Sequence, residues 1–128
     1  MCSSDLLTQT AARLLGDPST TSVDGAVTVT AAPVDLDRDG LQELSRLLTR
    51  EPDRVALLAG EKDGRGTLFV GSTSPSVSAV ALVEVAKPLF SGRGGGNPSA
   101  ATAVGEPGGP LRGALAAART EARRMAVG

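Results

Sequence analysis

Residues 54–71, RVALLAGEKDGRGTLFVG, decide the fold of this 128-residue chain. The run 54–59 is apolar at consecutive positions, which is typical of a central strand buried on both faces of a sheet. A second short strand follows at 67–71, and Asp63-Gly64 is a turn signal at the tip of the loop 60–66 between them. The stretch therefore predicts a hairpin at the centre of a sheet.

The residues before this hairpin predict one more strand and a helix. Alternation of valine and threonine over 26–33 indicates a half-buried strand, whose pairing ends at Pro33. Residues 35–51 carry leucines at helical spacing and predict an amphipathic helix closed by Pro52. Asp39, with Gln42 three residues later, resembles a capping-box start for that helix.

The first 25 residues are expected to lie outside the main domain. Residues 1–6 read Met-Cys-Ser-Ser-Asp-Leu, which the sequencing-adapter end GTG TGC TCT TCC GAT CT encodes with GTG as start codon. We therefore expect these six residues to be non-native and exclude them from the fold. Residues 7–25 are expected to form a short helix over 7–16 and a polar connector. The domain proper then spans 26–128.

A buried helix and a glycine loop are predicted after the hairpin. Residues 76–90 are apolar around most of a helical circumference, with a start at Ser74-Pro75 or Ser76. Pro88 is expected to bend or end this helix. Residues 91–98, SGRGGGNP, predict a loop.

The chain closes with a predicted strand and helix. Residues 99–104 are small and predict a short strand, and a Gly/Pro turn follows. Apolar residues recur at helical spacing over 111–125, with Pro110 in the first turn. The complete order predicts an α/β fold in which helices pack on a mixed β-sheet.

Composition excludes several kinds of chemistry. The sequence has no histidine, one cysteine and 2% aromatic residues. A Ser-His-Asp or Cys-His catalytic system, an imidazole metal site and a paired-cysteine zinc site are therefore excluded. RNA recognition by stacked aromatic platforms is disfavoured, because the only aromatic residues are Phe69 and Phe90. We expect no catalytic residues, no metal and no cofactor in this chain.

Charge is divided unevenly along the sequence. Residues 1–64 hold six basic and eleven acidic side chains, whereas residues 65–128 hold seven and three. A basic half can attract phosphate even when the net charge is −1, because local fields dominate within a Debye length. An uneven distribution in a short chain is the alternative explanation.

Gly92-Arg93-Gly94-Gly95-Gly96 is the most specific segment of the sequence. Glycines leave backbone N–H groups unshielded and allow positive φ angles, so consecutive amides can form a concave anion site. Arg93 would stand beside that site. A flexible turn is the alternative interpretation of the same run.

This segment and its surroundings resemble the C-terminal domain of alanyl-tRNA synthetase, called C-Ala, a member of the DHH-associated domain family. The family signature is Gly-Gly-(Lys/Arg)-Gly-Gly-Gly after a strand pair and a buried helix, and before a short strand and a closing helix. The resemblance covers roughly residues 20–126. Ser91 replaces the first glycine of the signature, and Thr102 stands where glutamine is common.

The resemblance implies a tRNA-binding module that holds the outer corner of tRNA and assists aminoacylation and editing by upstream domains. Its partners would be tRNA and those upstream domains of the parent chain. Arg93 would meet phosphate, and arginines of the last helix would add a basic stripe. The expected nucleic-acid-binding residues are Gly92, Arg93, Gly94, Gly95, Gly96, Asn97, Arg112, Arg119 and Arg123.

Two other functions remain as alternatives. The resemblance also fits the nucleotide-substrate-binding domain of a DHH-type phosphoesterase, whose metal site would lie on another domain. An Ala/Leu-rich last helix could make the chain a dimerisation module, giving a homodimer. Asp35, Asp37 and Asp39 resemble part of a calcium loop, but the twelfth position is Arg46 and not glutamate. We therefore interpret these acids as negative charge that complements the dipole at a helix N-terminus.

The sequence also bears on location. A single cysteine offers no disulfide framework, which is typical of a reducing compartment. No apolar run approaches the ~20 residues that span a bilayer, and no secretory signal opens the sequence. We expect a cytoplasmic protein without a membrane partner.

Overall fold

The computed structural model describes most of the chain. The described residues are 9, 12–14, 16–17, 21–24, 27–33, 38–50, 52–62, 64–74, 77–106 and 108–127. The six residues expected to be non-native lie outside this set, as do Asp35 and Asp37. Of the helix expected over 7–16, Gln9, residues 12–14 and Gly16 are described and are helical.

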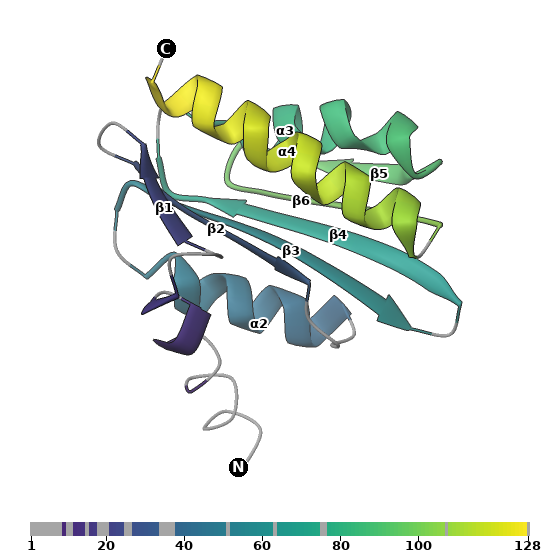
Figure 1. The fold of residues 1–128 in the computed structure, drawn as a ribbon, viewed down its shortest axis with the longest axis horizontal. Helices are drawn as coiled ribbons and strands as arrows, with labels where there is room; N and C mark the ends of the chain where they lie inside the picture. Colours follow the sequence, from purple (N-terminus) through teal and green to yellow (C-terminus); the bar gives the residue numbers. More distant parts are fainter. Residues whose placement is uncertain are drawn as a thin grey trace.

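In the part of the chain that the structure describes, a six-stranded mixed sheet forms the centre (Figure 1). Its strands are β1 (Thr21–Asp24), β2 (Val27–Pro33), β3 (Arg54–Lys62), β4 (Arg65–Ser72), β5 (Arg93–Gly96) and β6 (Ala100–Gly105). They lie in the order β1-β2-β3-β4-β6-β5. Only β2 and β3 run parallel, and every other neighbouring pair is antiparallel. The prediction of a mixed sheet in an α/β fold is confirmed.

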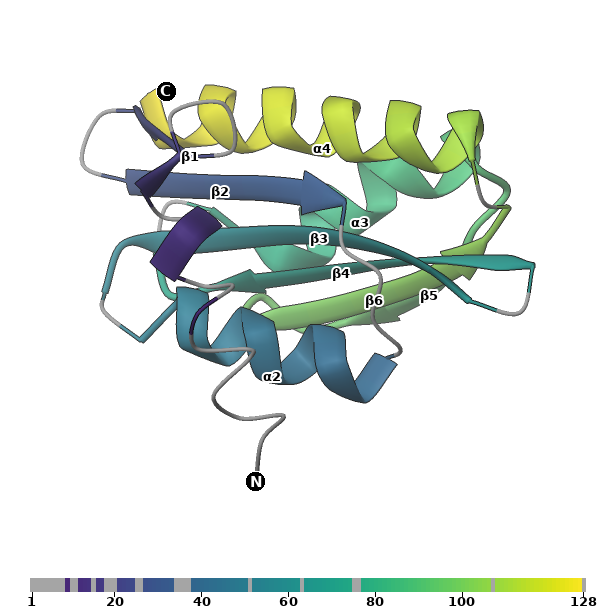
Figure 2. The ribbon, with the colours of Figure 1, turned by 60° about the horizontal axis from the view of Figure 1, so that its bottom comes forward.

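Helices cover both faces of this sheet. They are α2 (Arg38–Leu48), α3 (Ala79–Ala86) with the short 3₁₀ helix η1 (Lys87–Leu89), and α4 (Gly109–Val127). Helix α2 packs on β3 and β4 from one face, and α3 and α4 lie side by side on the other (Figure 2). Because α2 connects the parallel pair β2–β3, it runs back along the sheet in the antiparallel direction.

Strand β3 explains why the opening apolar run is continuous. Val55, Leu57 and Ala59 join the core beneath α3 and α4. Ala56 and Leu58 point the opposite way into the core beneath α2. Both faces of the strand are therefore buried, and the alternation expected of a half-solvated strand is absent. The central position predicted for β3 is confirmed.

The hairpin is tighter than predicted. The loop expected over 60–66 is wrong, because β3 continues to Lys62 and pairs there with Arg65. Gly64 takes a φ of +74° in the turn. The left-handed backbone that glycine permits is what closes the hairpin in so few residues.

The polar connector expected before residue 26 is also partly wrong, since Thr21–Asp24 form the edge strand β1. Its backbone pairs antiparallel with β2 over four residues. The hydroxyls of Thr21 and Thr30 share a hydrogen bond of 2.9 Å between the two strands. The side chain of Val23 is 70% exposed. Strand β1 therefore lacks the pattern of buried apolar residues by which a strand is predicted from a sequence.

Two helix starts differ from the sequence predictions. Helix α2 begins at Arg38, so Asp39 lies within the first turn and is not the N-cap. Its carboxylate there still complements the positive end of the helix dipole. Helix α3 begins later than expected, at Ala79 with Ser78 as N-cap, because Ser72 and Ser74 form a buried turn before it.

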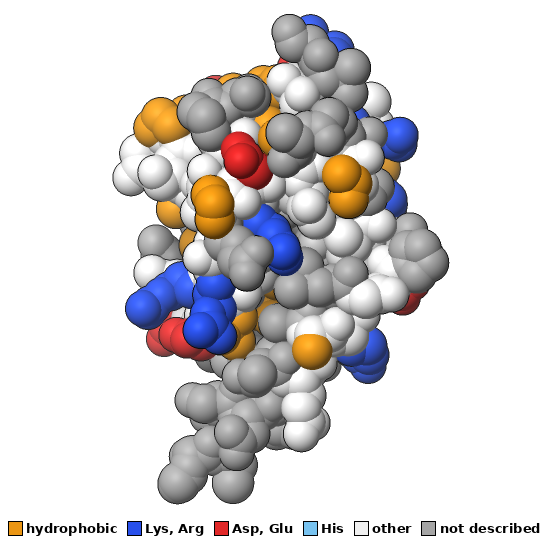
Figure 3. Space-filling model, turned by 90° about the vertical axis from the view of Figure 1, so that its left-hand side faces the viewer, with side chains coloured by type: hydrophobic (Ala, Val, Ile, Leu, Met, Phe, Trp, Pro, Cys, Tyr) orange, Lys and Arg blue, Asp and Glu red, His pale blue; other side chains and the backbone are white. Residues whose placement is uncertain are grey.

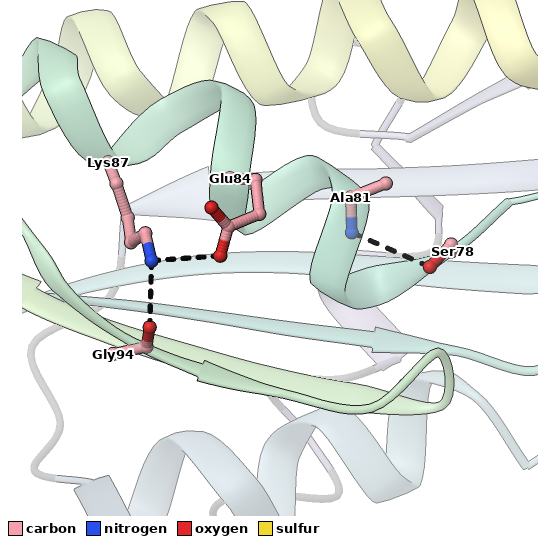
Figure 4. Close-up of polar contacts among 5 residues, drawn as sticks. All are labelled: Ser78, Ala81, Glu84, Lys87 and Gly94. Carbon is pink, nitrogen blue, oxygen red and sulfur yellow. Dashed lines mark hydrogen bonds and ion pairs between the residues drawn. The ribbon is translucent and has the colours of Figure 1, made fainter.

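Removing the α3 N-cap is expected to destabilise the domain modestly. The Ser78 hydroxyl accepts from the N–H of Ala81 at 3.5 Å (Figure 4). We expect Ser78→Ala to lower the free energy of unfolding by about 1 kcal/mol in urea denaturation, as N-cap losses typically do. Ser78→Asp, which can still cap, is the matched control. An equal loss in both variants would contradict the capping role.

Candidate nucleic-acid interface

The glycine-rich segment is a strand and not the predicted loop. Arg93–Gly96 form β5, which pairs antiparallel with β6 and lies at the edge of the sheet. All four residues are exposed. Pairing with β6 engages alternate backbone groups of the segment, so its amides do not converge on one point as a concave anion site requires.

Close approach to β6 explains why glycines occupy this strand. A Cβ at Gly94 would stand 2.9 Å from the Cα of Ala103 and far inside van der Waals distance of the Thr102 carbonyl oxygen. Gly94 also has a φ of +152°, which side chains rarely permit. A Cβ at Gly96 would lie 2.6 Å from the Cα of Ala101. The run therefore permits a tight strand pair, a role the sequence prediction missed.

Lys87 holds the outer edge of β5 (Figure 4). Its ammonium donates to the carbonyl oxygen of Gly94 at 2.9 Å and pairs with the Glu84 carboxylate at 2.8 Å. In the same region the N–H of Gly92 donates to the Lys87 carbonyl at 2.8 Å. The α3–η1 segment thus fixes the position of β5 from its open side.

Arg93 lies at one end of the sheet, together with the start of α4. It pairs with Val104 near the end of β6, next to the tip of the β3–β4 hairpin. Gly108, directly before α4, donates its N–H to the Glu61 carboxylate of that hairpin. Arg65 and Arg112 are exposed at this same end. We call Arg65, Arg93 and Arg112 the hairpin-end arginines; Arg65 was not predicted, although it flanks the Asp63-Gly64 turn.

The other arginines of α4 lie further along the helix. Arg119 and Arg123 follow Arg112 by seven and eleven residues, which is about 10 and 16 Å along a helix axis. Arg119 is half-buried, with its Nε buried, so it does not lie on a fully solvated face. Arg119 and Arg123 therefore extend away from Arg93 and do not surround it.

Arg124 is engaged by a neighbour on its own helix. Its guanidinium pairs with the Glu121 carboxylate one turn earlier. The hydrogen bond and the opposite charge raise the pKa of Arg124 and lower the pKa of Glu121. Arg124 keeps its charge in this pair, and a phosphate at this position would have to compete with Glu121.

Asn97 lies at the opposite end of β5 from Arg93. Its side-chain oxygen accepts from the N–H groups of Ser99 and Ala100 at 2.9 and 3.0 Å. These bonds shape the turn between β5 and β6, which is the usual role of asparagine in a turn. The predicted site residues are therefore spread along β5 and α4 and do not meet at one point.

A groove between α2 and the sheet was not predicted. It is open to solvent, has a volume of about 450 Å³ and lies near the end of the molecule where α2 ends and β3 begins. Its lining consists of Gln42, Ser45, Arg46, Thr49, Phe69, Gly71, Ser72, Thr73, Ser99 and Ala100. Figure 3 shows this end of the molecule, with several Lys and Arg side chains on its surface. We call this feature the α2 groove.

Two further properties of the described residues concern metals and membranes. No group of three or more His, Cys, Asp or Glu side chains comes together there in a way that could hold a metal ion. In the same part of the chain, no helix has both the length and the apolar character needed to cross a membrane.

Comparison with solved structures identifies the fold. The chain is similar to the C-Ala domain of Aquifex aeolicus alanyl-tRNA synthetase, with a TM-score of 0.69 and 19% sequence identity. The match covers 84% of this chain and 98% of that domain. No protein-family model and no curated protein sequence matches the chain. The C-Ala fold expected from the glycine signature is confirmed.

Proposed function

We propose that this chain is the tRNA-binding C-terminal module of an alanine–tRNA ligase, working in the cytoplasm. The observation that carries the proposal is the C-Ala fold, matched over 98% of the Aquifex aeolicus domain. In this role the chain supplies binding and no catalysis. Upstream domains of a parent enzyme would aminoacylate and edit the tRNA that it holds.

The hairpin-end arginines are the part of the chain proposed to meet RNA. Arg65, Arg93 and Arg112 are exposed and come from β4, β5 and α4. Guanidinium groups bind phosphate through paired N–H donors. Arg93 is followed by three glycines, so no side chain of β5 stands between its backbone and an approaching RNA strand.

Replacing Arg93 is expected to weaken binding of intact tRNA and to flatten its salt dependence. Loss of one phosphate contact should reduce the slope of log K against log salt by about 0.7–0.9. The measurement is a titration of Arg93→Ala with an alanine-specific tRNA transcript and with its acceptor minihelix, at several salt concentrations. We expect the wild-type chain to prefer the intact L shape.

Arg13→Ala is the matched control, because Arg13 is an exposed arginine outside the hairpin end. It should leave the slope unchanged. Equal, weak binding of tRNA and minihelix by the wild-type chain would overturn the proposal. If the slope of log K against log salt is unchanged in Arg93→Ala, Arg93 makes no phosphate contact with the tRNA.

A further inference from the structure

The α2 groove is built by three elements at defined spacings. Its α2 wall consists of four polar residues at positions i, i+3, i+4 and i+7, which lie on one helix face: Gln42, Ser45, Arg46 and Thr49. Phe69 and Gly71 are two residues apart on β4 and therefore face α2 together. Ser99 and Ala100 close the far side where β6 begins. Helix α2 packs mainly on β3 and β4, where Phe69 and Gly71 are buried, so the groove opens toward Ser99 and the start of β6.

The lining of the α2 groove is suited to an anion. Arg46 is its only charged side chain among the described residues, and none of the lining residues is acidic. The Arg46 guanidinium lies 3.6 Å from the Glu43 carboxylate; the Arg46 side chain is largely exposed and the Glu43 side chain is nearly half exposed. Exposed pairs of this kind are weak, so a phosphate inside the groove can replace Glu43 as the partner of Arg46.

Hydroxyl groups provide the remaining polar contacts. The Thr49 hydroxyl donates to the Ser45 carbonyl at 2.7 Å, and the Thr73 hydroxyl donates to the Arg54 carbonyl at 3.2 Å. The Thr73 oxygen also accepts from the N–H of Arg54 at 3.0 Å, so Thr49 is the hydroxyl offered here to an amino group of a ligand. Such a lining matches the many polar groups of a sugar and a base.

Phe69 forms an apolar part of the groove floor. Its side chain is 7% exposed and belongs to the core beneath α2. The volume of about 450 Å³ lies within the range of ~300–1,000 Å³ that small-molecule sites occupy. One arginine, several hydroxyls and one aromatic ring in a space of this size fit a phosphorylated ligand with a flat polar ring.

We propose that the α2 groove binds a single nucleotide, with its phosphate at Arg46 and its base toward Phe69. The inference rests on the proposed RNA-binding function for the source of that nucleotide, which would be an unpaired residue of the bound RNA. A free nucleoside monophosphate has the same recognised groups. The groove lies at the opposite end of β4 from Arg65, so it is separate from the hairpin-end arginines.

The test titrates the full chain with adenosine 5′-monophosphate, with single-stranded hexaadenylate and with intact tRNA, following amide chemical shifts and binding heats. Shifts are expected at Arg46, Thr49 and Ser99. Arg46→Ala should weaken binding of both small probes by about tenfold, the effect of losing one charge-assisted hydrogen bond. Tighter binding of hexaadenylate than of the mononucleotide would assign the site to RNA, and the reverse would assign it to free nucleotide.

A second variant keeps the charge and fills the space. Ser99 is exposed, so Ser99→Leu should fold normally and still block the groove. Arg50→Ala is the control, because Arg50 is an exposed arginine at the end of α2 outside the lining. It should change affinity for the small probes less than about twofold, as expected for a screened surface charge.

The outcomes separate this inference from the proposed function. If tRNA binds the wild-type chain but neither small probe does, or if Arg46→Ala and Ser99→Leu bind all probes normally, the groove proposal is overturned and the tRNA proposal stands. If tRNA fails to bind while the small probes bind and depend on Arg46, the groove proposal is supported and the tRNA proposal fails.

Discussion

Gly94→Ala is expected to lower the free energy of unfolding by about 2–6 kcal/mol, combining overpacking of ~1–3 kcal/mol with backbone strain of similar size. The added methyl group would stand 2.9 Å from the Cα of Ala103 and closer still to the Thr102 carbonyl oxygen. These are backbone atoms of a paired strand, so neither can move without breaking the β5–β6 pair. The residue would also have to hold a φ of +152°.

Gly95→Ala is the matched control in the same strand. A Cβ at Gly95 meets no atom within 4 Å, and its φ lies outside the positive range. We expect a change within about 0.5 kcal/mol, as for other exposed substitutions. Urea denaturation followed by far-UV circular dichroism is the suitable measurement, since the chain has no tryptophan or tyrosine to report on folding. Similar losses in the two variants would contradict the described pairing.

Phe90→Ala is expected to cost about 3–5 kcal/mol, the usual range for a fully buried phenylalanine. The ring is 0% exposed and lies in the core shared by α3 and α4. Truncation would leave a cavity directly below the start of β5, because a Cβ at Gly92 would already approach the ring to 2.6 Å. Small domains have only about 5–15 kcal/mol of stability, so this variant should lose much of it.

The neighbouring residue is the control for Phe90. Leu89 is 50% exposed, and Leu89→Ala should cost less than about 1 kcal/mol. The Phe90 carbonyl accepts from the N–H of Glu106 at 2.7 Å, which links the end of η1 to the residue after β6. Amide exchange at Glu106 should therefore accelerate in Phe90→Ala and not in Leu89→Ala. Retained protection at Glu106 would show that the ring does not position this contact.

The core elements were predictable because burial leaves a pattern in the sequence. The continuous apolar run of β3 and the leucine stripe of α2 each reflect which faces are buried. The edge strands β1 and β5 lack such a pattern, since Val23 is mostly exposed and β5 is largely glycine. Their strand character comes from pairing with a neighbour on one side, and a single sequence does not record that pairing.

The candidate site was predictable only in part. Arg93 could be recognised beside its glycines, but its distance from Asn97 and Arg123 depends on the directions of β5 and α4 in space. The polar stripe of Gln42, Arg46 and Thr49 looks like an ordinary solvated flank of a helix in the sequence. It becomes the wall of a groove because α2 lies across from Ser99 and Ala100 at the start of β6.

The contact between Lys87 and β5 has a consequence for how the molecule behaves in concentrated solution. An open sheet edge invites a strand from another molecule, and glycines offer no side chains to obstruct it. A strand added at β5 would have to take the Gly94 carbonyl from the Lys87 ammonium and disturb its pair with Glu84. Removing the hydrogen-bond partners and water from the Lys87 ammonium costs free energy, because a charged group is left unpaired. Lys87 therefore disfavours the addition of a second strand at β5 and opposes aggregation at this edge.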